Sequence, residues 1–415
     1  MFKVFTASWA LLLGMMFLMV GNGVQGTLLG IRGAIEGFST SQMSIVMSAY
    51  FAGFLFGSKM APELIRRVGH VRVFAALGSL ISAVLVLYAV IPDWIVWTLL
   101  RVLIGFCFSG VYVTAESWLN NTASNENRGQ ALSLYMIVQM VGIIAAQALI
   151  NFADPAGFLL FIIPSVLVSL AFAPILLSIS PAPTSGTTKS MSIRELYGVS
   201  PLGVVGIFLM GGVFAAMFGM TAVWGTEAGL SVFEISVFTA AIYFGGLVFQ
   251  YPIGWLSDRV DRRKLLVIVA LIGSAGGAIA VLFNLSFIWL LGVALIIGGI
   301  SNPLYSLLVA YTNDYLDHDQ MAAASGGLLF VNGLGAIIGP LAIGWLMALI
   351  GPSGFFLFII LLTTSLAVYA LWRMTQRPAV SVAETGPFAA VSPVVSAATV
   401  DAVYSELSEQ QTETS

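Results

Sequence analysis

The sequence predicts an all-α integral membrane protein in which twelve transmembrane helices form two pseudo-symmetric six-helix bundles. Three observations predict this fold class: charge is scarce, twelve apolar segments have spanning length, and basic residues gather in alternate breaks between them. Of the 415 residues, 59% are hydrophobic and only 8% are charged, whereas soluble domains carry roughly 25% charged residues. A chain with so little charge has to bury most of its surface in a lipid bilayer.

The twelve predicted spans are segments of about 20 mostly apolar residues, the length that crosses the hydrocarbon core. Polar or Pro/Gly-rich breaks separate them. They lie near 8–31, 42–64, 71–91, 94–119, 129–152, 157–178, 201–226, 234–257, 264–284, 287–312, 322–349 and 354–374. The first segment is longer than a signal-peptide core and lacks a small-residue cleavage pattern, so we interpret it as a membrane span.

Basic residues orient these spans. Because the number of spans is even, both termini lie on one side, which we take as the cytoplasm. Thirteen of the 16 basic residues (16 less Arg32, Lys59 and Arg101) then fall on that side: Lys3, Arg66, Arg67, Arg72, Arg128, Lys189, Arg194, Arg259, Arg262, Arg263, Lys264, Arg373 and Arg377. Arg32 lies in an outer loop, and Lys59 and Arg101 lie within spans. This distribution satisfies the positive-inside rule and predicts a multi-pass protein with both termini cytoplasmic.

Domain boundaries follow the composition of the breaks. Residues 179–200 are rich in Pro, Ser and Thr, and they are predicted to form a cytoplasmic linker between an N-terminal six-helix bundle (1–178) and a C-terminal one (201–374). Residues 375–415 combine Pro, Val, Ala, Ser and acidic residues without a helical period. That composition predicts a disordered cytoplasmic tail.

The two bundles are related in sequence. Tyr50-Phe51-Ala52-Gly53 recurs as Tyr243-Phe244-Gly245-Gly246, an offset of 193 positions (243 − 50). The same offset gives the pairs Tyr112 with Tyr305, Asn120 with Asn313, Gln139 with Asn332 and Gly142 with Gly335. Duplicated six-helix halves are typical of secondary transporters, whose substrate site lies between the halves near the midplane.

Several other function classes are disfavoured by what the sequence lacks. The basic residues form no stripe that would bind phosphates, so no nucleic-acid partner is expected. The single cysteine, Cys107, excludes an intrachain disulfide and disfavours a Cys-based metal site. His70 and His318 lie far apart, and no nucleophile–base pair or nucleotide-binding loop is visible. We therefore expect neither an enzyme nor a bound cofactor or metal.

The break between the eighth and ninth spans carries a recognisable motif. It reads Gly254-Trp-Leu256-Ser-Asp258-Arg259-Val-Asp261-Arg262-Arg263-Lys264 and resembles the loop signature of the major facilitator superfamily, Gly-x-Leu-Ala-Asp-Arg-x-Gly-Arg-Arg. The resemblance implies a cytoplasmic gate, in which Asp258 and the arginines Arg259, Arg262 and Arg263 pair across the two halves when the transporter faces outward.

A second copy of this loop follows the second span and reads Pro62-Glu-Leu64-Ile-Arg66-Arg67-Val-Gly69-His70-Val-Arg72. It keeps the family pattern around Arg67, Gly69 and Arg72. It has Arg66 where the family has Asp, so the usual charge pairing of the first half is altered.

Motifs within the spans refine the resemblance. Arg101-Val-Leu-Ile-Gly105 is similar to the second signature of the superfamily, an intramembrane arginine followed by glycine. A basic residue in the first gate loop, together with Glu116 before the Asn127-Arg128-Gly129 turn, resembles the YcaD-like branch of bacterial facilitators. That branch implies a bacterial cytoplasmic (inner) membrane. The fifth span lacks the Gly-Pro signature that drug exporters carry there, which argues against that assignment.

Two ionisable residues lie inside the fourth span, where each costs at least roughly 2.5–3.5 kcal/mol and therefore tends to be functional. Arg101 and Glu116 are 15 residues apart (116 − 101), which is about 22 Å along the helix and within about 60° around it. We expect Arg101 to contact the substrate or the proton pathway. We expect Glu116 to carry the coupling proton, since burial favours a protonated carboxyl. The alternatives are structural, a packing hydrogen bond for Arg101 and an ion pair for Glu116.

Uncharged polar residues of the spans are expected to line the same pathway: Asn22, Gln25, Tyr112, Gln139, Asn302, Tyr305 and Asn332. The seventh span offers mainly apolar side chains. These features predict a monomer that moves a small amphipathic solute by alternating access, coupled to protons. The alternative is a non-transporting receptor or assembly factor on the same fold. The direction of transport, import or export, and sodium in place of protons are open alternatives.

Overall fold

The computed structural model describes residues 2–122, 128–177, 191–317, 320–381, 385–386, 388–392, 400 and 403–404. Within these ranges the regular elements are helices. They are α1 (Phe2–Ile35), α2 (Thr40–Val68), α3 (His70–Val90), α4 (Trp94–Thr122), α5 (Arg128–Ile150), α6 (Leu159–Leu177), α7 (Ile193–Val199), α8 (Pro201–Ala215), a π-helical turn (Ala216–Met220), α9 (Thr221–Glu227), α10 (Val232–Ser257), α11 (Arg262–Leu282), α12 (Phe287–Asn313), α13 (Met321–Ile350) and α14 (Ser353–Met374).

The predicted fold class is confirmed. In the described part of the chain, eleven helical segments are long and apolar enough to cross a membrane. One of them, Pro201–Glu227, combines α8, the π turn and α9. The predicted sixth span corresponds to α6. Its stretch Leu159–Ala173 is apolar but shorter than the other eleven segments.

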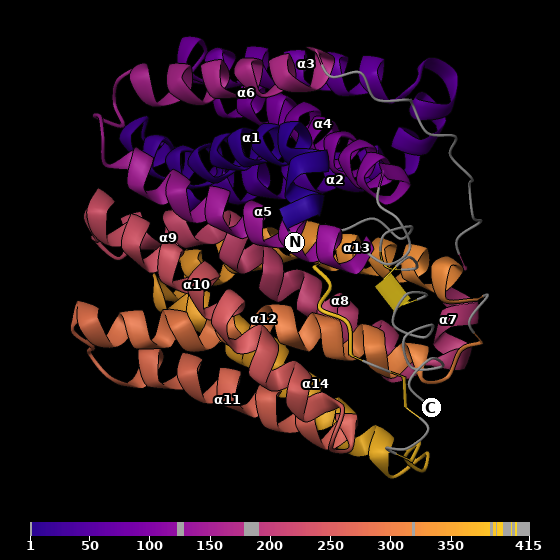
Figure 1. Ribbon diagram of the computed structural model, residues 1–415. Helices are drawn as coiled ribbons and strands as arrows, with labels where there is room; N and C mark the ends of the chain where they lie inside the picture. Colours follow the sequence, from indigo (N-terminus) through magenta and orange to yellow (C-terminus); the bar gives the residue numbers. More distant parts are fainter. Residues whose placement is uncertain are drawn as a thin grey trace.

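The two halves form two layers with the same internal plan (Figure 1). In the N-terminal half, α2 packs on α4, α1 on α5 and α3 on α6; in the C-terminal half, α10 packs on α12, α8 on α13 and α11 on α14. The halves meet where α2 contacts α13 and α5 contacts α10. Each pairing in one half has its repeat-related counterpart in the other, as a duplicated transporter fold requires.

Glycine allows the closest helix contacts in both halves. A Cβ atom on Gly105 of α4 would lie 2.1 Å from the carbonyl oxygen of Tyr50, and one on Gly298 of α12 would lie 1.9 Å from that of Ile242. The two glycines are 193 positions apart (298 − 105), so the duplication has kept the close approach. Small residues of this kind let membrane helices pack backbone to backbone.

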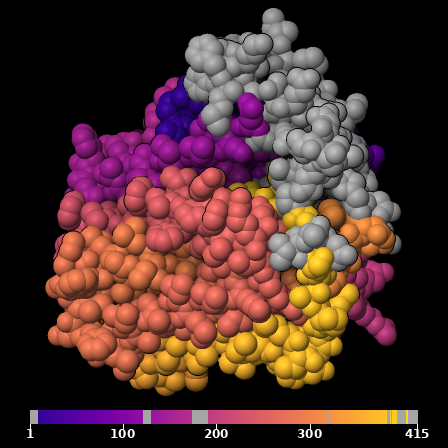
Figure 2. All heavy atoms as spheres, turned by 60° about the horizontal axis from the view of Figure 1, so that its bottom comes forward, coloured from indigo at the N-terminus to yellow at the C-terminus, as the bar shows by residue number. Residues whose placement is uncertain are grey.

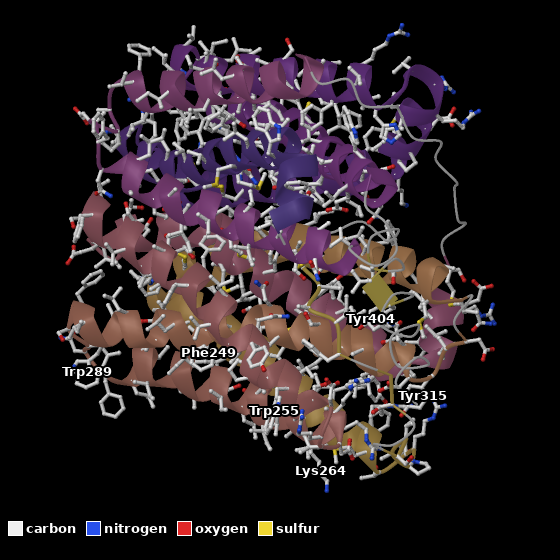
Figure 3. All side chains as sticks on the ribbon, viewed as in Figure 1. Phe249, Trp255, Lys264, Trp289, Tyr315 and Tyr404 are labelled. Atoms are coloured by element: carbon white, nitrogen blue, oxygen red, sulfur yellow. The ribbon has the colours of Figure 1, made fainter. Side chains whose placement is uncertain are left out.

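The outer faces of the bundle expose large apolar side chains. On the C-terminal half, which comes forward in Figure 2, these include Phe244, Val248, Ile268, Leu271, Leu282 and Val368. Trp289 and Trp255 are 69% and 50% exposed. Trp289 lies near the start of α12, at the left in Figure 3, and Trp255 lies near the end of α10. Exposed apolar faces bounded by tryptophans fit a membrane environment.

The linker and the tail contain structure that the sequence did not predict. Within 179–200, Ser192 and Glu195 form a capping box that starts α7, and Leu196 is buried against Gly327 of α13. The tail, 375–415, was predicted to be disordered, yet its described residues contact the C-terminal half. Ala389, Val391, Val400 and Tyr404 are buried there.

We expect Gly105→Val to destabilise the N-terminal half, because the new side chain would collide with the backbone of α2 at Tyr50. A backbone cannot move aside as a flexible side chain can. Overpacking of this kind costs about 1–3 kcal/mol. The measurement is the thermal melting of purified protein in detergent, where the midpoint should fall by several degrees.

Gly292→Val is the matched control, since a Cβ at Gly292 of α12 meets no atom within 4 Å. Equal melting temperatures for the two variants would contradict the close contact between α2 and α4.

Candidate functional site

Two cavities lie between the halves. The central cavity, about 510 Å³, is enclosed by α1, α2, α4, α5, the π turn, α9 and α10. The second, about 720 Å³, reaches toward the end of the bundle that carries α7 and is lined by residues such as Ser58 of α2 and Leu329 of α13. We call that end the linker end and this space the linker-side cavity.

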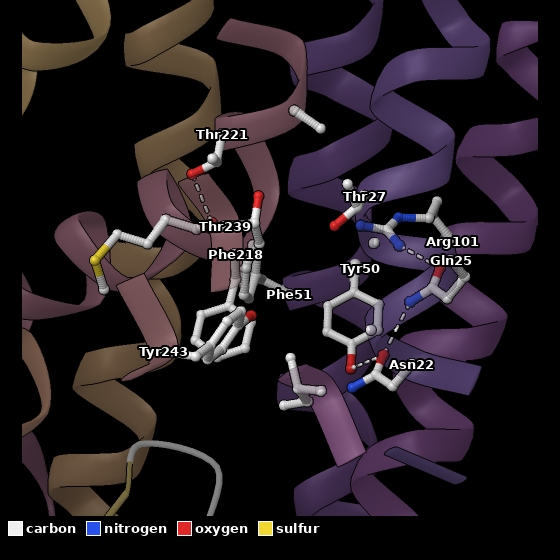
Figure 4. A pocket seen from close by; sticks show the side chains of 15 residues that line it. Asn22, Gln25, Thr27, Tyr50, Phe51, Arg101, Phe218, Thr221, Thr239 and Tyr243 are labelled. Atoms are coloured by element: carbon white, nitrogen blue, oxygen red, sulfur yellow. Dashed lines mark hydrogen bonds between the residues drawn. The ribbon is translucent and has the colours of Figure 1, made fainter. Parts of the chain in front are cut away.

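A chain of hydrogen bonds forms one wall of the central cavity (Figure 4). Arg101 Nη1 donates to Gln25 Oε1 at 2.6 Å, Gln25 Nε2 donates to Asn22 Oδ1 at 2.9 Å, and Asn22 Nδ2 donates to Tyr112 Oη at 3.0 Å. Tyr50 Oη also donates to Asn22 Oδ1, at 3.4 Å. The structure therefore joins four of the polar residues that the sequence predicted for the pathway.

Helical spacing explains this convergence. Asn22 and Gln25 are three residues apart on α1 and so share a face. Arg101 and Tyr112 are eleven residues apart on α4 (112 − 101), close to three full turns, and therefore point the same way. Arg101 is only 2% exposed and lies with its guanidinium 4.7 Å from the centre of the Tyr50 ring, a distance at which a cation and an aromatic face attract.

The opposite wall comes from the C-terminal half. Met217 and Phe218 belong to the π-helical turn, and Thr221, Thr239 and Tyr243 complete this side. In Figure 4 the labelled side chains of this wall, Phe218, Thr221, Thr239 and Tyr243, lie across the cavity from Tyr50 and Arg101. Single π turns within longer helices are frequent at functional sites, because the extra residue re-aims the neighbouring side chains.

An aromatic layer separates the two cavities. Tyr50, Phe51 and Phe218 line both spaces. The ring of Phe218 lies 4.0 Å from that of Phe214 and 4.9 Å from that of Tyr243, and Phe51 lies 5.5 Å from Tyr50. The rings come from both halves and lie where the two cavities adjoin.

The sequence missed several residues of this site. Tyr50 and Tyr243 occur in the repeated Tyr-Phe motif, so the repeat marked them, but they were not predicted to line the pathway. Thr27, Thr221 and Thr239 also line the central cavity. Their hydroxyls bond within helices as readily as they bond a ligand, which is why composition could not single them out.

Gln139 and Asn332 line the linker-side cavity from opposite halves. Asn332 Oδ1 is buried without a hydrogen-bond partner among the described residues, and the side chain of Gln139 interacts with Tyr135. A buried polar atom without a partner is costly unless a ligand or water satisfies it. Gln139 and Asn332, which the sequence repeat relates to each other, thus lie at the same cavity.

Three predicted pathway residues lie outside the lining of the two cavities. Glu116 is fully buried and accepts a hydrogen bond from Tyr135 Oη at 3.3 Å. Asn302 of α12 lies beside Gly246 of α10. Tyr305 is buried in the core of the C-terminal half.

The first gate loop forms charge contacts on its own helix. Arg66 and Arg67 both pair with Glu63, at 2.7 and 2.6 Å. Gly69 has a φ of +85° at the sharp turn from α2 to α3, and Arg72 is exposed.

The second gate loop pairs within the C-terminal half. Arg262 contacts Asp314 at 2.5 Å and Asp258 at 3.4 Å. Burial raises the pKa of the Asp314 carboxyl, and the Arg262 guanidinium opposes that shift. Arg263 pairs with Asp261, while Arg259 stacks on Trp255. Among the described residues, none of the ion pairs of this loop crosses between the halves.

Comparisons with known proteins agree with this architecture. The pattern of the Major Facilitator Superfamily matches residues 11–246 and 204–406. The chain is 29% identical over 339 residues to the uncharacterized MFS-type transporter YcaD of Escherichia fergusonii, with 80% of this chain and 86% of the relative covered. It is 27% identical over 392 residues to the uncharacterized MFS-type transporter YE1530 of Yersinia enterocolitica, with 92% and 97% covered.

Two solved structures share the fold. The nucleoside transporter NupG superposes with a TM-score of 0.69 at 13% identity, over 89% of this chain and 98% of that one. A bacterial homolog of the human lysosomal transporter Spinster, in an inward-facing and unoccupied conformation, gives 0.68 at 14% identity over 98% of both chains. The predicted similarity to YcaD-like transporters is thus confirmed. Since the family pattern covers both halves, the chain belongs to the Major Facilitator Superfamily.

Proposed function

We propose that this transporter moves a small amphipathic solute across the bacterial cytoplasmic membrane by alternating access, and that protons drive it. The observation that carries the proposal is the central cavity, enclosed by both halves and lined by the hydrogen-bonded chain from Arg101 to Tyr112. A site held between two packed bodies can open to either side when the bodies rock, which is the basis of transport by duplicated folds.

The chemistry of the walls supports an amphipathic solute. The N-terminal half presents a guanidinium and amides, and the C-terminal half presents aromatic rings, a thioether and hydroxyls. A sugar would need more amide and acid partners than the second wall offers. A solute with one polar end and one apolar body fits both walls.

Glu116 is the proposed proton carrier. It lies on α4, is fully buried, and contacts Tyr135 of α5. Tyr135 is four residues from Gln139, so the two share a face of α5, and Gln139 lines the linker-side cavity. This arrangement offers a route of polar groups between the carboxyl and the cavity.

Asn22 borders both cavities, so Asn22→Leu should remove the hydrogen bonds that organise Gln25, Tyr50 and Tyr112. A thermal-shift screen of metabolites and drugs first identifies a ligand, because ligand binding raises the stability of the folded state. We expect the variant to bind it about tenfold more weakly or worse, a difference of about 1.4 kcal/mol.

Asn284→Leu, at an exposed position between α11 and α12, is the control for that substitution. Unchanged affinity and flux in Asn22→Leu would place the substrate elsewhere. A ligand that binds but never crosses proteoliposome membranes would favour the receptor alternative.

Glu116→Gln should abolish pH-driven accumulation of the identified solute in proteoliposomes while leaving counterflow exchange, because the amide cannot release a proton. The exposed Asp317 provides the control Asp317→Asn, which should accumulate solute normally. Full pH-driven accumulation by Glu116→Gln would remove this carboxyl from the coupling mechanism.

A further inference from the structure

We infer that the substrate of the central cavity is a small organic oxyanion, a carboxylate or phosphate on an apolar body, whose charge is bound by Arg101. This inference rests on the proposed transport function and adds the class of substrate. Its basis is a buried cation at the cavity wall without a counter-charge.

Arg101 is incompletely satisfied. Its five N–H donors require acceptors when buried, yet Nε has no hydrogen-bond partner among the described residues. Nη1 donates to the amide oxygen of Gln25, and Nη2 donates to the sulfur of Met47 at 3.2 Å, a weak acceptor. The hydroxyl of Tyr88 interacts with the guanidinium of Arg101, but a phenol supplies no negative charge.

No carboxylate of the described residues lies within ion-pair distance of Arg101, and none of the described residues that line the central cavity is acidic. Leaving a charge buried and unpaired is strongly unfavourable. An oxyanion entering the cavity would provide the missing charge and could engage the guanidinium with two parallel hydrogen bonds.

The remaining lining fits the rest of such a molecule. Asn22, Thr221 and Thr239 can contact oxygen atoms, while Met217, Phe218 and Tyr243 surround an apolar body. A cation is disfavoured here because it would face Arg101. A neutral solute would leave the charge of the guanidinium unpaired, so it would bind with a less favourable free energy than an anion.

The test is a thermal-shift titration of purified protein in nanodiscs with solutes matched in shape and differing in charge. The probes are phenylacetate, phenylacetamide, phenethylamine and phenyl phosphate. We expect the anions to raise the melting temperature and the amide and amine not to, and the first and last probes distinguish carboxylate from phosphate. Arg101→Gln should weaken anion binding about tenfold or more.

Arg101→Lys serves as the conservative variant, because it keeps the charge but loses the planar fork. It should retain the preference for anions with reduced affinity, and it replaces Arg101→Gln if that variant does not fold. Arg194→Gln, exposed on α7, controls for the loss of a positive charge. Equal stabilisation by amide and anion, no stabilisation by either anion, or full anion binding in Arg101→Gln would overturn the inference.

The two proposals fail in different ways. Flux of a neutral or cationic solute would refute the inference that the substrate is an oxyanion, while the proposed transport function would stand. Anion binding through Arg101 without flux in proteoliposomes would refute the proposed transport function, while the inferred anion-binding site would stand.

A second inference comes from the tail. We propose that residues 388–392 act as a strap that covers the linker-side cavity and holds the second gate loop. The backbone N–H of Phe388 donates to Asp258 at 2.8 Å, and its ring lies against Gly254. Ser306 Oγ donates to the carbonyl of Val391 at 2.9 Å. Ser392, the last residue of the strap, lines the cavity itself.

The strap therefore occupies groups that belong to the gate. Asp258 and Gly254 are signature residues of the loop between α10 and α11, and Arg262 also donates to the carbonyl of Gly386 beside the strap. As long as these bonds hold, access from the linker end to the linker-side cavity is restricted. Release of the strap would open it.

Cysteine accessibility tests this without a known substrate. Ser58 lines the linker-side cavity, and the native Cys107 is buried, so Ser58→Cys gives a specific target for a water-soluble maleimide. In the full chain, adding Phe388→Asp and Val391→Asp should speed its labelling about tenfold, as expected when a local contact opens. Ser353→Cys, exposed at the start of α14, should label at an unchanged rate. Equal rates for Ser58→Cys with and without the strap substitutions would refute the strap.

Discussion

The structure depends on a constraint imposed by lipid: polar groups have to find partners inside the bundle. The exposed faces of α10, α11 and α14 carry side chains such as Phe244, Leu271 and Val368, which hydrocarbon solvates without cost. Some polar side chains of the spans pair within one half, as Ser274 does with Thr363, and others lie at the contact between the halves. There Asn22, Gln25 and Arg101 form a hydrogen-bonded chain that lines the central cavity.

This constraint explains how much could be predicted from the sequence. Scarce charge, segment lengths and the alternating basic residues gave the fold class and the two halves, and polar residues in spans identified Asn22, Gln25, Arg101 and Tyr112. The remainder depends on depth and packing. Glu116 shares a face of α4 with Arg101, but about 22 Å along the axis takes it past the cavity lining to Tyr135.

The duplicated halves are alike in backbone and unlike in chemistry. Gly105 and Gly298 preserve the same close helix contact, and Tyr50 and Tyr243 both line the central cavity. At the position that corresponds to Arg101 (101 + 193) the second half has Ala294, which is buried in its core. In the proposed transport cycle, symmetric packing would let the halves rock, and Arg101 on one wall of the site would orient the proposed amphipathic substrate.

The unpaired guanidinium also bears on the conformational change itself. An empty carrier would have to rearrange around a buried positive charge whose partners among the described residues are neutral: an amide, a thioether and the tyrosines Tyr50 and Tyr88. With an oxyanion bound, the same site holds a neutral ion pair, and the cost of enclosing it in low dielectric falls. Ligand binding shifts a conformational equilibrium only through a difference in affinity between its states. Charge neutralisation at Arg101 supplies such a difference, so the loaded carrier would cross the occluded state more readily than the empty one.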